Sequence, residues 1–168
     1  MTMAVAGTTA SRALAVLPDP RVDVPMVERQ EKYDAILRSL ELNQRLTDVQ
    51  RAAQDVRDGL DRVNALLEGE EDQAYEALRD AARELRRGLG EASSTDEVNQ
   101  YRRSVFGLAG SYDRPTEGQL LDLRRMADAL DRLEGTMNVF LVDDVARFRE
   151  LVRAANLDAF PEPEMVGG

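Results

Sequence analysis

The sequence contains no histidine, no cysteine and no tryptophan, and its only lysine is Lys32. Histidine is the commonest general base and metal ligand, while cysteine supplies disulfides, thiolate ligands and nucleophiles. Serine–histidine–aspartate triads, HExxH zinc sites and histidine–carboxylate iron sites therefore cannot be assembled from these residues. Only carboxylate pairs, tyrosine, lysine and arginine remain for catalysis, so we expect the chain to have no enzymatic activity.

Positive charge and long apolar runs are also scarce. The 22 basic residues are outnumbered by 32 acidic ones, which leaves a net charge of -10. Arginines such as Arg45, Arg51 and Arg57 alternate with acidic residues, a pattern typical of solvated helix faces. We expect no nucleic-acid partner, because phosphate binding needs a concentrated positive face. No apolar run reaches the roughly 20 residues of a membrane span, and the first ten residues lack the basic start of a secretory signal.

Prolines divide the chain into three predicted regions. Pro18, Pro20 and Pro25 follow a start of small and β-branched residues, so residues 1–25 are predicted to be an extended segment and linker. Within it, the run from Ser11 to Leu17 is a candidate strand. Such a strand either packs along the helices or closes a sheet located elsewhere. We expect a helical bundle over residues 26–160 and a disordered tail over residues 161–168.

The clearest pattern in the chain is a heptad repeat in the first predicted helix, which begins near Met26. Tyr33, Ile36, Leu37 and Leu40 are predicted to share one face of its opening turns. A seam with alternating intervals of four and three then follows, which we call the core seam: Leu42, Leu46, Val49, Ala53, Val56, Leu60, Val63 and Leu67. Gly69 is the expected cap, and the helix would be about 60 Å long.

Further helices are predicted from capping signals and apolar stripes. The acidic run from Glu70 to Asp72 is expected to open the second helix, which Gly88 and Gly90 end. Ser94 with Glu97, and Thr116 with Gln119, match the capping box that begins a helix. The expected apolar faces are Tyr75, Leu78, Ala82, Leu85 and Leu89; Val98, Tyr101, Val105, Leu108 and Tyr112; and Leu123, Met126, Leu130, Leu133, Met137 and Phe140. The last stripe then shifts through Leu141, Val145, Phe148, Leu151 and Val152 toward Leu157, before Pro161 and Pro163.

The helix lengths predict an all-α fold, an antiparallel three- to four-helix bundle. The first and last helices are each about 60 Å long, and the two middle helices are about 25 to 30 Å each. Two long helices would therefore pack with a broken middle leg, jointed near Gly90. The alternative is a local four-helix bundle from which one long helix protrudes as a dimerisation arm.

The sequence contains acidic and aromatic clusters that could form sites. Glu70 to Asp72, and Asp143 with Asp144, lack the alternating order of a calcium loop. We interpret them as helix starts or solvated faces, with Asp144 paired to Arg147. Core packing accounts for the aromatic and methionine side chains, which are Tyr33, Tyr75, Tyr101, Tyr112, Met126, Met137, Phe140 and Phe148. The sequence therefore predicts no catalytic, cofactor-binding or metal-binding residues.

One passage resembles a known family. The run LAVLPDPRV from Leu14 to Val22, followed by a long heptad helix, is similar to a junction in BNR-repeat, sortilin-like β-propeller proteins, which are often classed with glycosyl hydrolases. An RPT turn at Arg114–Thr116 agrees with it, and the resemblance extends from Ser11 to Leu157. It implies that this chain corresponds to the helical region C-terminal to the propellers. The Asp-box of the propeller blades requires tryptophan, so no catalytic residue of that family carries over.

Two functional hypotheses remain open. The first is a non-catalytic helical accessory module that packs on a protein partner or on itself. The second is a free-standing coiled-coil adaptor that forms a homodimer through the heptad helix at residues 42–67. Neither hypothesis involves a cofactor.

Overall fold

The structure, a computed structural model, describes residues 24–68, 75–111 and 113–157, the backbone of two N-terminal strands, and the single residues Met165 and Gly167. Its helical elements in chain order are α1 (Met26–Leu66), α2 (Glu76–Ala92), α3 (Asp96–Val105), the 3₁₀ turn η2 (Phe106–Gly110), α4 (Glu117–Phe140), the π-helical turn η3 (Leu141–Val145) and α5 (Ala146–Ala154). The prediction that the chain is helical after residue 25 is confirmed for this described part.

Two short strands precede the helices. β1 (Thr2–Val5) pairs antiparallel with β2 (Thr8–Ser11), so that Thr2 faces Ser11 and Val5 faces Thr8. The strand predicted for residues 11–17 meets β2 only at Ser11, and residues 12–17 lie outside the described part. Most of the tail predicted for residues 161–168 lies outside it as well.

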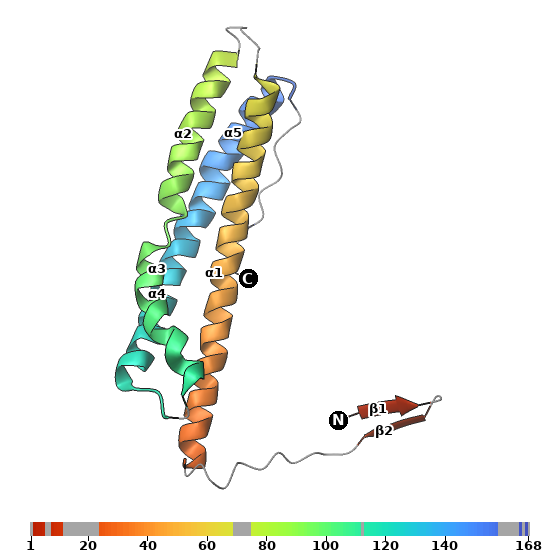
Figure 1. Cartoon of the computed structure of the whole chain (residues 1–168). Helices are drawn as coiled ribbons and strands as arrows, with labels where there is room; N and C mark the ends of the chain where they lie inside the picture. The colour runs from red at the N-terminus through yellow and green to blue at the C-terminus, as the bar shows by residue number, and fades with distance from the viewer. Residues whose placement is uncertain are drawn as a thin grey trace.

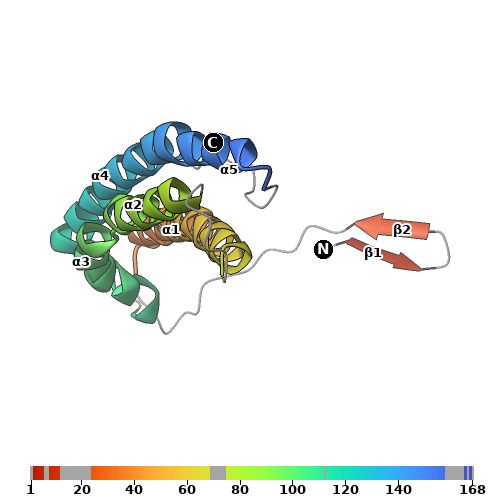
Figure 2. The same cartoon turned by 90° about the horizontal axis from the view of Figure 1, so that it is seen from above.

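The helices form three legs that lie side by side (Figure 1). α1 spans the length of this assembly, α2 and α3 return along it in sequence, and α4 continues through η3 into α5 beside them. Figure 2 shows α4 and α5 curving along one side of the group. Helices of similar length on the first and last legs bring residues far apart in the sequence into one common core.

The core seam of α1 lies inside this group of helices. All eight of its residues are at most 4% exposed, and Leu42, Val49, Leu60 and Val63 are fully buried. They join one apolar cluster with Leu85 and Leu89 of α2 and with Met126, Leu130 and Met137 of α4. The seam predicted to bind a second copy at residues 42–67 is therefore occupied by the chain's own helices. A homodimer through it would require the core to open.

The opening turns of α1 differ from the prediction. Tyr33, Leu37 and Leu40, predicted to share one face with Ile36, are 56%, 46% and 61% exposed, whereas Ile36 is partly buried against the core. The residue that faces the core at this level is Ala35, which is 4% exposed. Ala35 lies one heptad before Leu42 and so continues the core seam. Because alanine is small, the larger side chains beside it indicated the wrong face of the helix.

Gly88 and Gly90 do not end α2, as the sequence predicted, since the helix continues to Ala92. Gly88 serves helix packing instead: a Cβ atom there would lie 3.2 Å from Cε2 of Phe140. The missing side chain lets the Phe140 ring of α4 approach the backbone of α2 closely. The break in the middle leg lies at residues 93–95, where the backbone amide of Ser93 donates to the carbonyl of Leu89 over 3.0 Å.

The capping box predicted for α3 is absent. The N-cap residue is Thr95, whose side chain makes no capping bond. Ser94 Oγ instead lies 3.2 Å from Asp96 Oδ2. Glu97 accepts from Arg132 of α4 over 2.5 Å. A tertiary ion pair thus replaces the local bond that the sequence motif suggested.

The capping box of α4 is confirmed, because Gln119 N donates to Thr116 Oγ1 over 3.1 Å and Thr116 N donates to Gln119 Oε1 over 2.9 Å.

The predicted shift of the last apolar stripe coincides with η3. Phe140 and Leu141 are both buried there, because a π turn inserts one extra residue and moves the apolar stripe by one position.

The last helix, α5, ends at Ala154. The predicted apolar stripe ran further, toward Leu157. Asn156 adopts a left-handed backbone with φ 55°, a conformation that commonly terminates helices. The amide of Leu157 then donates to the carbonyl of Val152 over 3.0 Å. The chain therefore leaves the helix before Pro161.

The two glycines of α2 yield a matched prediction about stability. We expect Gly90→Ala to stabilise the protein by about 0.5–1 kcal/mol, because alanine favours helix over glycine and nothing lies within 4 Å of a Cβ atom at Gly90. Gly88→Ala should lack this gain, because the Phe140 ring must move. Urea unfolding measures both variants. An equal gain at the two positions would contradict the packing role of Gly88.

Candidate interaction surfaces

Of the acidic residues predicted to be solvated, the structure describes Asp143 and Asp144. Asp143 and Asp144 lie on η3. The side chain of Asp144 is 50% exposed, and its Oδ1 lies 3.8 Å from Arg147 Nη1, as predicted. Glu70 to Asp72 lie outside the described residues. Within the described part, no three acidic side chains gather closely enough to hold a metal ion.

Most of the aromatic and methionine side chains predicted for the core are buried there. Met126, Met137, Phe140 and Phe148 are at most 5% exposed. Tyr75 and Tyr101 are partly buried against the same cluster, and the guanidinium carbon of Arg125 lies 6.0 Å from the Tyr101 ring centre. Tyr33 is the exception, being exposed. Tyr112 lies outside the described residues.

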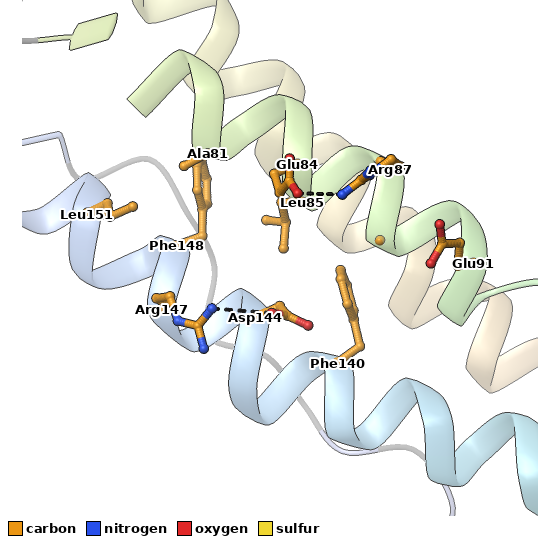
Figure 3. Close-up of a pocket in the computed structure, with 11 residues that line it drawn as sticks. Ala81, Glu84, Leu85, Arg87, Glu91, Phe140, Asp144, Arg147, Phe148 and Leu151 are labelled. Carbon is orange, nitrogen blue, oxygen red and sulfur yellow. Dashed lines mark hydrogen bonds and ion pairs between the residues drawn. The ribbon is translucent and has the colours of Figure 1, made fainter. Parts of the chain in front are cut away.

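A groove of about 280 Å³ lies between α2 and the segment formed by η3 and α5 (Figure 3). Phe140 and Phe148 point from the last leg toward α2, where Leu85 and Gly88 complete the floor. Charged residues line its edges and include two ion pairs, one between Arg87 and Glu84 of α2 and one between Arg147 of α5 and Asp144 of η3. Since the floor residues Leu85, Phe140 and Phe148 are almost fully buried, the groove is a shallow contact zone between helices.

A partly buried ion pair joins α1 to α4. Nε of Arg45 donates to Oε1 of Glu134 over 2.9 Å, and its Nη2 donates to Oε2 over 2.6 Å and to Asp131 Oδ1 over 2.6 Å. Glu134 is 9% exposed. The hydrogen bond to Glu134, above all, raises the pKa of the Arg45 guanidinium above its ordinary value.

Gly167 lies against the same carboxylate. It has φ 81°, in the left-handed region that favours glycine, and a Cβ atom there would lie 2.8 Å from Oε2 of Glu134. A side chain at this position would therefore collide with the group that Arg45 binds.

Lys32, the only lysine in the sequence, connects α1 to the segment between η2 and α4. Its Nζ donates to the backbone carbonyls of Ser111 and Asp113, the latter over 3.2 Å. Nearby, Nε of Arg114 donates to Glu31 over 2.6 Å. These contacts fasten the first turns of α1 to the segment between η2 and α4. An amine held by backbone acceptors in this way lacks the apolar setting that activates catalytic lysines.

The most distinctive surface is an apolar row on α1, which we call the outer stripe: Met26, Tyr33, Leu37 and Leu40. These residues are between 46% and 68% exposed. They recur at intervals of seven, four and three, the spacing of a heptad seam. Tyr33 and Leu40 each precede a core-seam position, Ala35 and Leu42, by two residues. At 100° per residue this places the stripe on the far side of the helix from the core.

The sequence predicted that Tyr33, Leu37 and Leu40 share one face of the helix, but not that this face points away from the core. The residues 33, 37 and 40 have heptad spacing, but their register is two residues out of step with the core seam. A single helix that carries two such registers has two apolar faces, and only one of them can be the core of this chain.

Comparison with known proteins adds no assignment, since no family model, no curated protein and no solved structure matches the chain. Among the helices in the described residues, none is both long and apolar enough to cross a membrane.

Proposed function

We propose that this chain is a non-catalytic helical interaction module that binds a protein partner through the outer stripe. The observation that supports the proposal is the heptad-spaced exposure of Met26, Tyr33, Leu37 and Leu40 on the face of α1 opposite the core. Single exposed apolar residues are ordinary on protein surfaces, whereas aligned ones mark interaction sites. Covering such side chains contributes about 25 cal/mol per Å² of apolar surface.

The resemblance to BNR-repeat, sortilin-like proteins suggests where such a partner is to be sought. We propose that the chain acts as the helical accessory region of such a protein, in which case the propeller is the first partner to test. The glycosyl hydrolase classification of that family would then belong to the propeller and not to these helices.

Homodimerisation through residues 42–67, the alternative from the sequence, has less support. The heptad residues of that segment are buried among α1, α2 and α4. A dimer through them would exchange one buried surface for another and would gain little apolar burial. The outer stripe, by contrast, binds a partner with no change in the core.

Quantitative affinity capture tests the proposal with a matched control. The bait is the wild-type chain, the double variant Leu37→Asp/Leu40→Asp, or Val139→Asp on α4. Val139 is 61% exposed, as is Leu40, so all three baits should fold. We expect at least one protein in extracts of the source cells to be retained by wild type and Val139→Asp and to be reduced at least about tenfold with the double variant, because a carboxylate in an apolar contact is costly.

A purified partner found in this way should bind with the same order of affinities in isolation. Identical protein sets on all three baits would count against the outer stripe as the binding surface. Retention that Val139→Asp also abolishes would move the surface to α4.

A further inference from the structure

We propose that the partner of the outer stripe is an amphipathic helix whose apolar seam is flanked by lysine or arginine. This inference rests on the proposed function and adds the chemistry of the partner. The inference depends on charged side chains along one edge of the stripe. An apolar row alone binds many amphipathic helices, and these charges favour helices whose flanking residues carry the opposite charge.

An acidic edge runs beside the outer stripe. Asp34, Glu41 and Asp48 recur at intervals of seven residues. Each follows by one residue a position of the seven-residue repeat to which Tyr33 and Leu40 belong. Asp34 and Glu41 are exposed and Asp48 is half-buried. In a paired coiled coil, residues at this position face the flanking charges of the partner helix. The edge therefore presents a carboxylate once every two helical turns, over about 21 Å.

The local bonds of these carboxylates leave acceptor capacity for a partner. Gln30 donates to Asp34 Oδ1 over 2.8 Å, Arg38 pairs with Glu41 Oε2 at 2.8 Å, and Gln44 and Arg51 bond Asp48 Oδ1 at 3.1 and 2.9 Å. Each carboxylate thus uses one of its two oxygens within the described chain. Each can accept further hydrogen bonds from a guanidinium or ammonium group.

The opposite edge of the stripe does not mirror this charge. Arg29, Ile36 and Asn43 lie there by the same register, and Nε of Arg29 donates to the carbonyl of Val24 over 2.8 Å. The stripe therefore has one acidic edge and one nearly neutral edge. A helix that matches it needs basic residues mainly on the side that faces Asp34, Glu41 and Asp48.

A second copy of this chain fits the surface poorly. Two stripes packed antiparallel would bring the acidic edges of both copies together, and two parallel stripes would supply one arginine, Arg29, for three carboxylates. Each copy also carries a net charge of -10, which opposes association. Four half-exposed side chains offer on the order of 400 Å² of surface, about half of the 800 Å² per partner in a typical stable interface. A separate basic helix avoids the repulsion and suits a small, reversible contact.

Fluorescence anisotropy with designed peptides tests the inference. Two dye-labelled peptides of three heptads share leucines at the seam positions and carry either lysine or glutamate at all flanking positions. They are titrated with the wild-type chain, Asp34→Asn/Glu41→Gln, Leu37→Asp, and the control Val139→Asp. We expect wild type and Val139→Asp to bind the lysine peptide at least about tenfold more tightly than the glutamate peptide. Neutralising both acids should weaken lysine-peptide binding by roughly two- to twentyfold and reduce its salt dependence, and Leu37→Asp should abolish binding.

Each other outcome overturns a defined part of this account. Equal affinity for both peptides, lost in Leu37→Asp, would refute the basic partner and leave the stripe as a docking surface. Lysine-peptide binding that survives Leu37→Asp would place the charge attraction elsewhere on the acidic surface. If the wild-type chain bound neither peptide, the inference would be refuted. The capture experiment tests the proposed function separately. A wild-type dimer in light scattering that Leu37→Asp converts to monomer would assign the stripe to a second copy.

Discussion

Leu60→Asp should unfold this protein, whereas Leu40→Asp on the same helix should leave its stability almost unchanged. Leu60 is fully buried in the core seam, and Leu40 is 61% exposed on the outer stripe. The two substitutions make the same chemical change on one helix. Their difference therefore isolates which face of α1 the fold uses.

The expected size follows from desolvation. An aspartate at residue 60 would bury a carboxylate among Leu, Val and Met side chains, or force the helices apart to reach water. Either route costs more than about 4 kcal/mol, a large part of the 5–15 kcal/mol by which domains are usually stable. At residue 40 the carboxylate stays hydrated, and the change should be within about 0.5 kcal/mol.

Thermal melts followed by circular dichroism at 222 nm measure both variants. A melting curve of Leu60→Asp that matches wild type would contradict the burial of the core seam. A destabilised Leu40→Asp would mean that the outer stripe packs within the chain, and the proposed interaction surface would be lost with it.

Arg45→Ala should destabilise the protein by about 2–4 kcal/mol, because it leaves the carboxylate of Glu134 buried with no cation. The guanidinium binds both oxygens of Glu134 at 2.9 and 2.6 Å. Side-chain exposures of 24% for Arg45 and 11% for Glu134 place the pair at the margin of the core. The cost should therefore fall toward the lower end of the range for buried pairs.

A double variant distinguishes loss of the pair from an unpaired charge. Arg45→Met/Glu134→Leu removes both charges and keeps apolar volume, and it should be within about 1 kcal/mol of wild type. Arg83→Ala breaks the exposed pair with Asp80 and should change stability by less than about 1 kcal/mol. Urea unfolding measures all three variants. If Arg45→Ala and the double variant were equally unstable, the loss of stability would come from the lost contact itself and not from the uncompensated charge of Glu134.

Local sequence patterns predicted the parts of the fold that depend on neighbouring residues. The seam from Leu42 to Leu67 could be read because a helix repeats its buried face every three or four residues. Thr116 with Gln119 predicted a capping box because both bonds close within four residues. The shift between Phe140 and Leu141 was visible as a slip of one position in the apolar stripe, whereas its cause, a π turn, appears only in the three-dimensional structure.

Patterns that admit two interpretations were decided by packing. A glycine near a helix end can stop the helix or admit a neighbour, and the Phe140 ring beside Gly88 settles which. Ser94 and Glu97 have capping-box spacing, but Arg132 of α4 binds the glutamate. Nothing in the local sequence distinguishes Glu134 from an exposed acidic residue, because its partner Arg45 lies 89 residues earlier in the chain.

The sequence by itself determined that this chain is helical, acidic and without histidine or cysteine chemistry, because composition and short-range periodicity are properties of the residues alone. The tertiary structure decided which of two apolar faces on the opening turns of α1 is the core. That choice depends on where η2 and the start of α4 meet α1: Lys32 reaches Ser111 and Asp113 there, and Ala35 faces inward. Contacts across about 80 residues leave no local periodicity to read, so only the placement of the helices shows that Tyr33, Leu37 and Leu40 face away from the core.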